Sequence, residues 1–129
     1  MHPPAVCTLH VVFPNKYKLR LSDKKENAVI NIFLLADVEG LAGVDSMAQM
    51  DRKSPEYENT RILLCDSINK AVSACFEAKA DKVYYLDGHG GGGNAIENLI
   101  DPRAKKCTIQ SLRPLLITNQ YHRTRLVNL

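Results

Sequence analysis

Two β-rich apolar runs, separated by one long amphipathic segment, restrict this chain to an α/β fold. The first run, Ala28–Ala36, is apolar almost throughout, as expected for a strand that is covered on both faces. The second run, Lys82–Leu86, contains a valine and two tyrosines. A strand, a helix and a strand in succession form a βαβ unit, which is nearly always right-handed. We therefore expect a small parallel sheet whose two strands end at the same edge.

The helix between the two strands is marked both at its start and along its length. Ser54 is placed as an N-cap, Pro55 takes the first helical position, and Glu56 puts an acid in the first turn. Apolar residues then recur with helical period to about Lys79. These residues are Tyr57, Leu64, Cys65, Ile68, Ala71, Val72, Cys75 and Phe76. The sequence therefore predicts one long helix with a single apolar face.

Length and composition fit one small domain with a segment on either side. The chain has 129 residues, of which 45% are hydrophobic and 24% charged, as in an ordinary globular protein. We expect an N-terminal extension over residues 1–27, an α/β domain over 28–106 and a basic C-terminal segment over 107–129. The extension should contain short strands or a hairpin around Pro14, followed by a charged linker.

Several classes of protein are disfavoured by the sequence. There is no apolar stretch of membrane-spanning length, and the segment Met1–Pro4 lacks the basic start and apolar core of a secretory signal, so we expect a cytoplasmic protein. The cysteines show no CxxC spacing and are predicted to be reduced and packed rather than zinc-bound or in disulfides. They are Cys7, Cys65, Cys75 and Cys107.

The positive charge of the chain is concentrated near its C-terminus. The formal net charge is +3, and no acidic residue follows Asp101. A basic segment of this kind can contact nucleic acid, but Tyr121 alone among its residues could stack on a base. We therefore expect a solvated end, with neither nucleic acid nor a membrane as partner.

Two carboxylates follow the first predicted strand. Asp37 and Glu39 come directly after Ala36, and residues two apart in an extended chain project to the same side. Their charges would repel each other. A divalent cation, a shared proton or a cluster of basic side chains could offset this repulsion, and the pair alone does not distinguish these possibilities.

Asp87 and His89 stand at the corresponding end of the second predicted strand. Because parallel strands bring their carboxyl ends together, we expect these two residues to meet Asp37 and Glu39. Carboxylates and an imidazole can hold a divalent metal, and Asp87 could orient His89. An alternative is that the two aspartates cap loops while His89 is exposed on a glycine-rich turn. Each motif is weak by itself, so both interpretations remain open here.

Four consecutive glycines follow His89 and precede a predicted short helix over Asn94–Ile100. The run Gly88–Gly93 formally fits G-x-G-x-x-G, which is typical of dinucleotide binding. However, no acidic residue lies about 20 residues further on to hold a ribose hydroxyl. A more general alternative is a phosphate or another anion held by backbone amides of this loop.

Three separated segments resemble one protein family in their order and spacing. They are Ile32–Gly43, Tyr57–Arg61 and Val83–His89, and the last is followed by the motif Asp101–Ala104. Together they resemble the amino-terminal half of the DppA-type D-aminopeptidases, which are the M55 family of zinc metallopeptidases. The resemblance covers about residues 30–106. It implies a three-layer α/β fold, truncated relative to the family, that assembles into ring-shaped homo-oligomers.

The resemblance also implies a chemistry. In that family a dinuclear zinc site at the strand ends hydrolyses short peptides that begin with a D-amino acid, using a zinc-activated hydroxide. Carried over by motif, Asp37 would be the bridging carboxylate, Glu39 a ligand to one zinc ion, and His89 a further ligand. We therefore expect one or two zinc ions as cofactor and a peptide as substrate.

His122 is a further candidate ligand. It ends an apolar run and follows Tyr121, which is similar to the family's second histidine motif, although a surface histidine near the C-terminus is the alternative. In the family a second half of the chain brings a further histidine and a glutamate to the second zinc site. The alternative function is therefore a catalytically inactive remnant that acts as a metal-binding or oligomer-interaction module.

Overall fold

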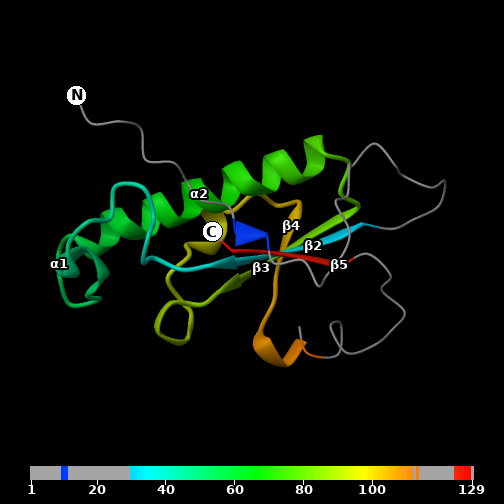
Figure 1. The fold of residues 1–129 in the computed structure, drawn as a ribbon. Helices are drawn as coiled ribbons and strands as arrows, with labels where there is room; N and C mark the ends of the chain where they lie inside the picture. Colours follow the sequence, from blue (N-terminus) through cyan, green and yellow to red (C-terminus); the bar gives the residue numbers. More distant parts are fainter. Residues whose placement is uncertain (1–9, 12–29, 112, 114–123, 129) are drawn as a thin grey trace.

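The fold is a small sheet with one long helix packed on it. The computed structural model describes residues 10–11, 30–111, 113 and 124–128. The sheet has five strands in the order β1-β5-β2-β3-β4 (Figure 1). The strands are β1 (His10–Val11), β2 (Asn31–Ala36), β3 (Lys82–Asp87), β4 (Ala104–Lys106) and β5 (Thr124–Asn128). The helices are α1 (Met47–Met50) and α2 (Tyr57–Glu77), with 3₁₀ turns at His89–Gly91 and Glu97–Leu99.

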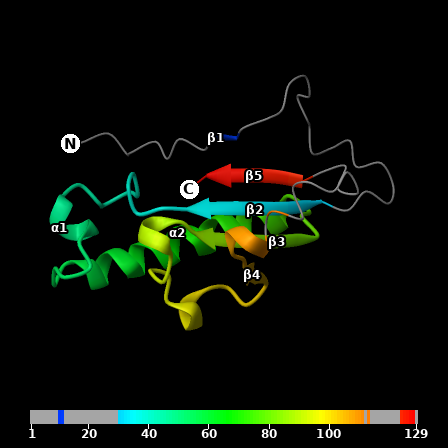
Figure 2. The same ribbon diagram turned by 90° about the horizontal axis from the view of Figure 1, so that it is seen from below.

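The predicted parallel pair of strands is confirmed. β2 and β3 run parallel, with Ala36 opposite Asp87 at their carboxyl ends. β5 lies parallel to β2 on its other side, and β4 lies parallel to β3. β1 pairs with β5 in the antiparallel direction. Figure 2 shows β2 and β5 pointing the same way, toward the end of the sheet where α1 lies. The α/β class with a parallel core is therefore as the sequence predicts.

Helix α2 supplies the main hydrophobic core. Leu64, Ile68 and Val72 are completely buried and belong to one cluster with side chains of β2 and β3. The helix begins at Tyr57, three residues after the predicted cap, because residues 54–56 form a separate turn in which the Ser54 hydroxyl accepts from the Glu56 N–H. It ends before Lys79, whose φ of 68° reverses the chain toward β3.

The opposite face of the sheet carries a second, smaller cluster. Phe33 is 2% exposed and stacks on Tyr84, with ring centroids 4.8 Å apart. Cys107 is buried beside them, and its thiol donates to the backbone oxygen of Tyr85. Since all β2 residues except the half-buried Leu35 are buried, the prediction that this strand is covered on both faces is confirmed.

One local feature was not predicted, and one local prediction needs correction. The segment between β2 and α2 contains the short helix α1, which forms because Ser46 and Gln49 make a reciprocal capping box. The helix expected over 94–100 is only a 3₁₀ turn at 97–99. No helix runs through residues 94–96 because Ile96 is extended, with φ −88° and ψ 103°.

The two flanking segments differ in how far they can be compared with the prediction. β4 and β5 were not predicted. Both lie at or beyond the end of the recognised α/β pattern, and β5 falls within the basic segment 107–129. β1 falls within the strand expected near the N-terminus, whereas the hairpin around Pro14 lies outside the described residues. Within the described ranges, no helix has both the length and the apolar character that crossing a membrane requires.

Candidate metal centre

Two carboxylates are presented where β2 ends. Val38, between them, is completely buried in the main core, so its neighbours Asp37 and Glu39 project away from the core. Asp37 is fixed locally, because its Oδ1 accepts the Val38 N–H at 2.8 Å. Gly40 then takes a φ of 89°, which turns the chain out of the strand direction.

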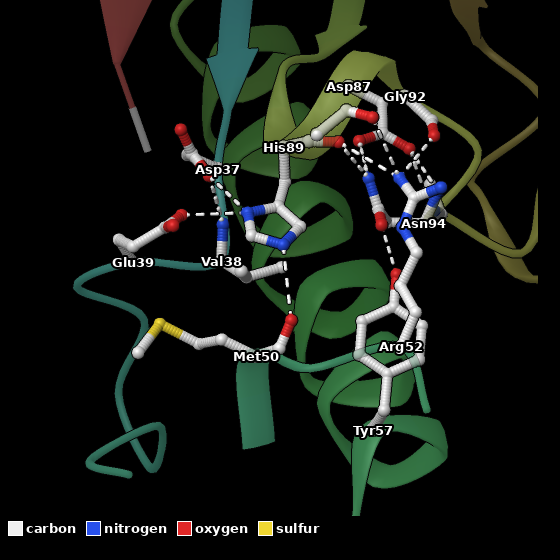
Figure 3. Close-up of polar contacts among 12 residues, drawn as sticks. Asp37, Val38, Glu39, Met50, Arg52, Tyr57, Asp87, His89, Gly92 and Asn94 are labelled. Carbon is white, nitrogen blue, oxygen red and sulfur yellow. Dashed lines mark hydrogen bonds and ion pairs between the residues drawn. The ribbon is translucent and has the colours of Figure 1, made fainter. Parts of the chain in front are cut away.

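The end of β3 brings His89 to this pair (Figure 3). His89 Nδ1 lies 3.2 Å from Asp37 Oδ1 and 2.9 Å from Glu39 Oε2. One ligand atom from each of the three residues falls within 4.8 Å of the other two. The structure therefore brings together three of the four residues that were expected to meet at the ends of the parallel strands. His122, the fourth candidate ligand, lies outside the described residues.

The second nitrogen of the imidazole is held on the other side. His89 Nε2 lies 3.3 Å from the backbone oxygen of Met50, and the ring is largely buried, with 14% of its side chain exposed. A carbonyl oxygen can only accept, so Nε2 carries the hydrogen of this bond. In neutral His89, Nδ1 then has a free lone pair directed at the carboxylates, which is the arrangement of a metal-ligating histidine.

The three ionisable groups of the cluster shift one another's pKa. Burial, and then a hydrogen bond with Glu39, raise the pKa of Asp37. The same hydrogen bond lowers the pKa of Glu39. For His89, burial lowers the pKa, but the hydrogen bond and the charge of Glu39 outweigh it, so that the pKa is raised. These shifts reflect the repulsion between two neighbouring carboxylates, which a proton or an opposite charge offsets.

A divalent cation can take over that role. The cluster offers two carboxylate oxygens and one imidazole nitrogen, all of which are ordinary zinc ligands. Glu39 is exposed and Asp37 is partly exposed, so one side of the cluster remains open to solvent. Three protein ligands with an open side are the composition of a catalytic rather than a structural zinc site, and the residues present therefore fit a zinc ion.

Asp87 contributes indirectly, which corrects the expectation that it contacts His89. Its carboxylate accepts the backbone N–H groups of Asn94 and Ala95 at 2.6 and 2.8 Å. Asn94 is completely buried, and its Nδ2 bridges Asp87 Oδ1 at 2.7 Å and the His89 carbonyl at 2.6 Å. The Tyr57 hydroxyl donates to Asn94 Oδ1 from below (Figure 3). Asp87 therefore acts on His89 through Asn94.

The same contacts disfavour the dinucleotide and phosphate interpretations of the glycine run. Those interpretations need free backbone amides at the start of a helix. Here the amides of Asn94 and Ala95 already donate to Asp87, and only a 3₁₀ turn follows, at 97–99. The glycines serve a different purpose, since Gly90, Gly91, Gly92 and Gly93 all have positive φ. They bend the chain sharply after His89.

Sequence reasoning missed three residues that surround His89. They are Met50, which accepts from the ring, Asn94, which donates to the backbone, and Arg52, whose guanidinium meets the glycine loop. Arg52 is 37 residues away from His89 along the chain, and no spacing rule connects such positions. Asn94 was assigned to a helix, so its role as a buried bridge had no signal in the sequence.

Comparisons with known proteins identify a matching family and a similar fold. A family model described as D-aminopeptidase, Peptidase_M55, matches residues 30–117 and so includes all three clustered residues. No curated protein sequence matches the chain significantly. Among solved structures, the fold is similar to that of the Zn-dependent D-aminopeptidase DppA from Bacillus subtilis, described as a self-compartmentalizing protease. The TM-score is 0.59 at 20% identity, and the match covers 61% of this chain but 29% of that one.

Proposed function

This chain belongs to the M55 family of D-aminopeptidases, and on that premise we propose that Asp37, Glu39 and His89 bind zinc for the hydrolysis of short peptides. The observation that carries the proposal is the meeting of these three side chains at the carboxyl ends of β2 and β3, within the region that matches the family. In parallel α/β sheets this edge is where ligands usually bind.

Each residue has a definite task in this proposal. His89 supplies Nδ1, while the bond from Nε2 to the Met50 carbonyl keeps the ring in the required tautomer. Asp37, with its backbone contact to Val38, is the more fixed carboxylate, and Glu39 lies toward solvent. A bound zinc ion supplies Lewis acidity, which lowers the pKa of a water molecule and polarises an amide carbonyl. If a second zinc ion binds, Asp37 would be a ligand to both ions, as the family resemblance implies, and His122 would be a further candidate ligand.

Zinc binding is tested directly with the purified chain. We expect near-stoichiometric zinc by metal analysis after dialysis, and loss of most of it in the near-isosteric variants Asp37→Asn and His89→Gln. Asp45→Asn is the matched control, because Asp45 is an exposed acid of the same connection between β2 and α1 whose side chain is not part of the cluster. A folded wild-type protein that binds no zinc would exclude the proposed metal centre.

Peptide hydrolysis requires a separate measurement. We propose release of D-alanine from D-alanyl peptides, abolished by a chelator and restored by zinc, with no release from the L-alanyl counterpart. The second candidate function is an inactive metal-binding or oligomer-interaction module, and the match to the similar solved structure covers 29% of that chain. Zinc binding without turnover would support this second function.

We also propose that copies of the chain assemble with one another. The similar solved structure is described as self-compartmentalizing, a property that requires several subunits. Light scattering coupled to size-exclusion chromatography would give the mass directly. A mass equal to the 14.4 kDa of one chain at micromolar concentration would contradict the assembly.

A further inference from the structure

The segment Met50–Arg52, at the end of α1, contacts His89 and the glycine loop that follows it. The guanidinium Nη2 of Arg52 lies 3.2 Å from the His89 carbonyl oxygen, 3.2 Å from that of Gly90 and 2.7 Å from that of Gly92. Two residues earlier, the Met50 carbonyl accepts from the His89 ring. Figure 3 shows Met50 against the ring and Arg52 against the loop. The same segment therefore contacts both the imidazole ring and the backbone carbonyl of His89.

The glycine loop needs such a contact because it has little rigidity of its own. The loop has no side chains that could pack, because it consists of the glycines at positions 90–93. Their φ values of 52°, 86°, 88° and 83° lie in the region that favours glycine. One hydrogen bond closes the loop internally, from the Gly92 N–H to the His89 carbonyl at 2.9 Å. A charged donor that binds three carbonyls at once restricts a backbone that would otherwise have many conformations.

The fit between Arg52 and the loop is close. A Cβ added to Gly90 would lie 3.3 Å from Arg52 Nη2, so the guanidinium sits directly against the backbone. Its Nη2 has two hydrogens for three oxygens, with the shortest contact to Gly92. Asn94 Nδ2 donates to the same His89 carbonyl. That oxygen thus accepts from two side chains, in addition to the Gly92 N–H.

We propose that Arg52 is a positioning residue, which fixes His89 for metal binding through the carbonyls of the glycine loop. The proposal rests on the proposed zinc site and adds to it a residue outside the ligand set. Charge alone would act in the opposite direction, because a guanidinium near a divalent cation repels it. Removing Arg52 should therefore raise zinc affinity if only its charge matters, and lower it if positioning dominates.

The sign of the change in zinc affinity is the test. Zinc dissociation constants would be measured by competition with a chromophoric chelator for wild type, Arg52→Ala, Arg52→Lys and Lys53→Ala. Lys53→Ala is the matched control, since it removes a neighbouring exposed positive charge that has no contact with the glycine loop among the described residues. We expect Arg52→Ala to weaken zinc binding about 10- to 100-fold, the effect typical of residues that orient a metal ligand.

Two further measurements separate positioning from general damage to the fold. The absorption spectrum of bound Co²⁺ reports ligand geometry, and we expect it to change in Arg52→Ala while the far-UV circular dichroism does not. Millimolar methylguanidinium should partly restore zinc affinity in Arg52→Ala but leave Lys53→Ala unchanged. Arg52→Lys should fall between wild type and Arg52→Ala, because an ammonium group can bind the carbonyls without the planar fork.

The outcomes distinguish this inference from the proposed function. If wild type binds no zinc, the metal centre itself is excluded, and the role of Arg52 falls with it. If wild type binds zinc and Arg52→Ala binds it equally or more tightly, the positioning role alone is overturned. If Lys53→Ala loses as much affinity as Arg52→Ala, the loss is not specific to the contacts between Arg52 and the glycine loop, which also overturns the positioning role.

Discussion

The glycine loop shows how a single residue can determine the geometry behind the site. Gly92 has a φ of 88°, and a Cβ added there would lie 3.2 Å from the backbone oxygen of Asp87. Gly93 has a similar φ of 83°, but an added Cβ would have no atom within 4 Å. The two positions therefore share the unfavourable backbone conformation and differ in the steric contact.

This difference gives a matched pair of variants. We expect Gly93→Ala to lower the free energy of unfolding by about 1–2 kcal/mol, the cost of a left-handed conformation for an L-residue. Gly92→Ala should cost more, because the backbone oxygen of Asp87 would have to move away. Such a shift would disturb the hydrogen bonds that the Asp87 carboxylate accepts from the N–H groups of Asn94 and Ala95. Urea unfolding followed by circular dichroism measures both. Equal destabilisation by the two variants would show that the contact with Asp87 is unimportant.

At the scale of single residues, the sequence was informative about the candidate metal ligands and uninformative about the residues that support them. Asp37, Glu39 and His89 could be predicted because each follows a recognisable strand, and strand ends converge in a parallel sheet. Arg52 and Asn94 could not, because their roles depend on distances between distant loops. Side chains that support a site through backbone carbonyls leave no spacing pattern.

At the scale of elements, α2 is the part of the chain that holds the βαβ unit together. Its buried residues face β2 and β3, and its outer face is exposed to solvent. Leu64 and Ile62 represent these two faces, with 0% and 52% of the residue exposed. The two side chains have the same number of carbons, so their truncation compares burial alone.

We expect Leu64→Ala to destabilise the protein by about 2–5 kcal/mol, as is usual when a cavity is left in a core. Ile62→Ala should change the free energy of unfolding by less than about 0.5 kcal/mol, since it is a surface substitution. Both values come from urea unfolding. A similar loss in the two variants would mean that the outer face of α2 is covered in solution, as it would be in an assembly of several chains.

Elements with a strong local pattern could be predicted, and those formed by long-range contacts could not. The periodicity of α2 and the apolar run of β2 were sufficient to identify both. The residues after the glycines carry a helical pattern, yet Ile96 and Ile100 are extended and only a 3₁₀ turn forms between them. β5 has only five residues and pairs with β2 more than 85 positions earlier in the chain, so nothing local marks it.

For the molecule as a whole, the central question is whether the two faces of the sheet form one cooperative unit. Cys65 is a residue of α2 and lies in the main core. Cys107 lies in the smaller cluster on the opposite face of the sheet. Both are buried, and burial raises the pKa of each thiol. Because the thiolate is the reactive form, both should react slowly with alkylating agents while the protein is folded.

Thiol reactivity can therefore follow the two faces separately. In a Cys7→Ser background, which removes the cysteine that lies outside the described residues, we expect Cys65 and Cys107 to become alkylated by iodoacetamide over the same range of urea concentration. That range should coincide with the loss of circular dichroism, because β2 and β3 contribute side chains to both clusters and cannot lose one partner face without weakening the other. Peptide mapping by mass spectrometry gives the labelling at each site. If Cys107 reacts at clearly lower urea than Cys65, the smaller cluster opens on its own, and the face that it covers is a separate unit of lower stability.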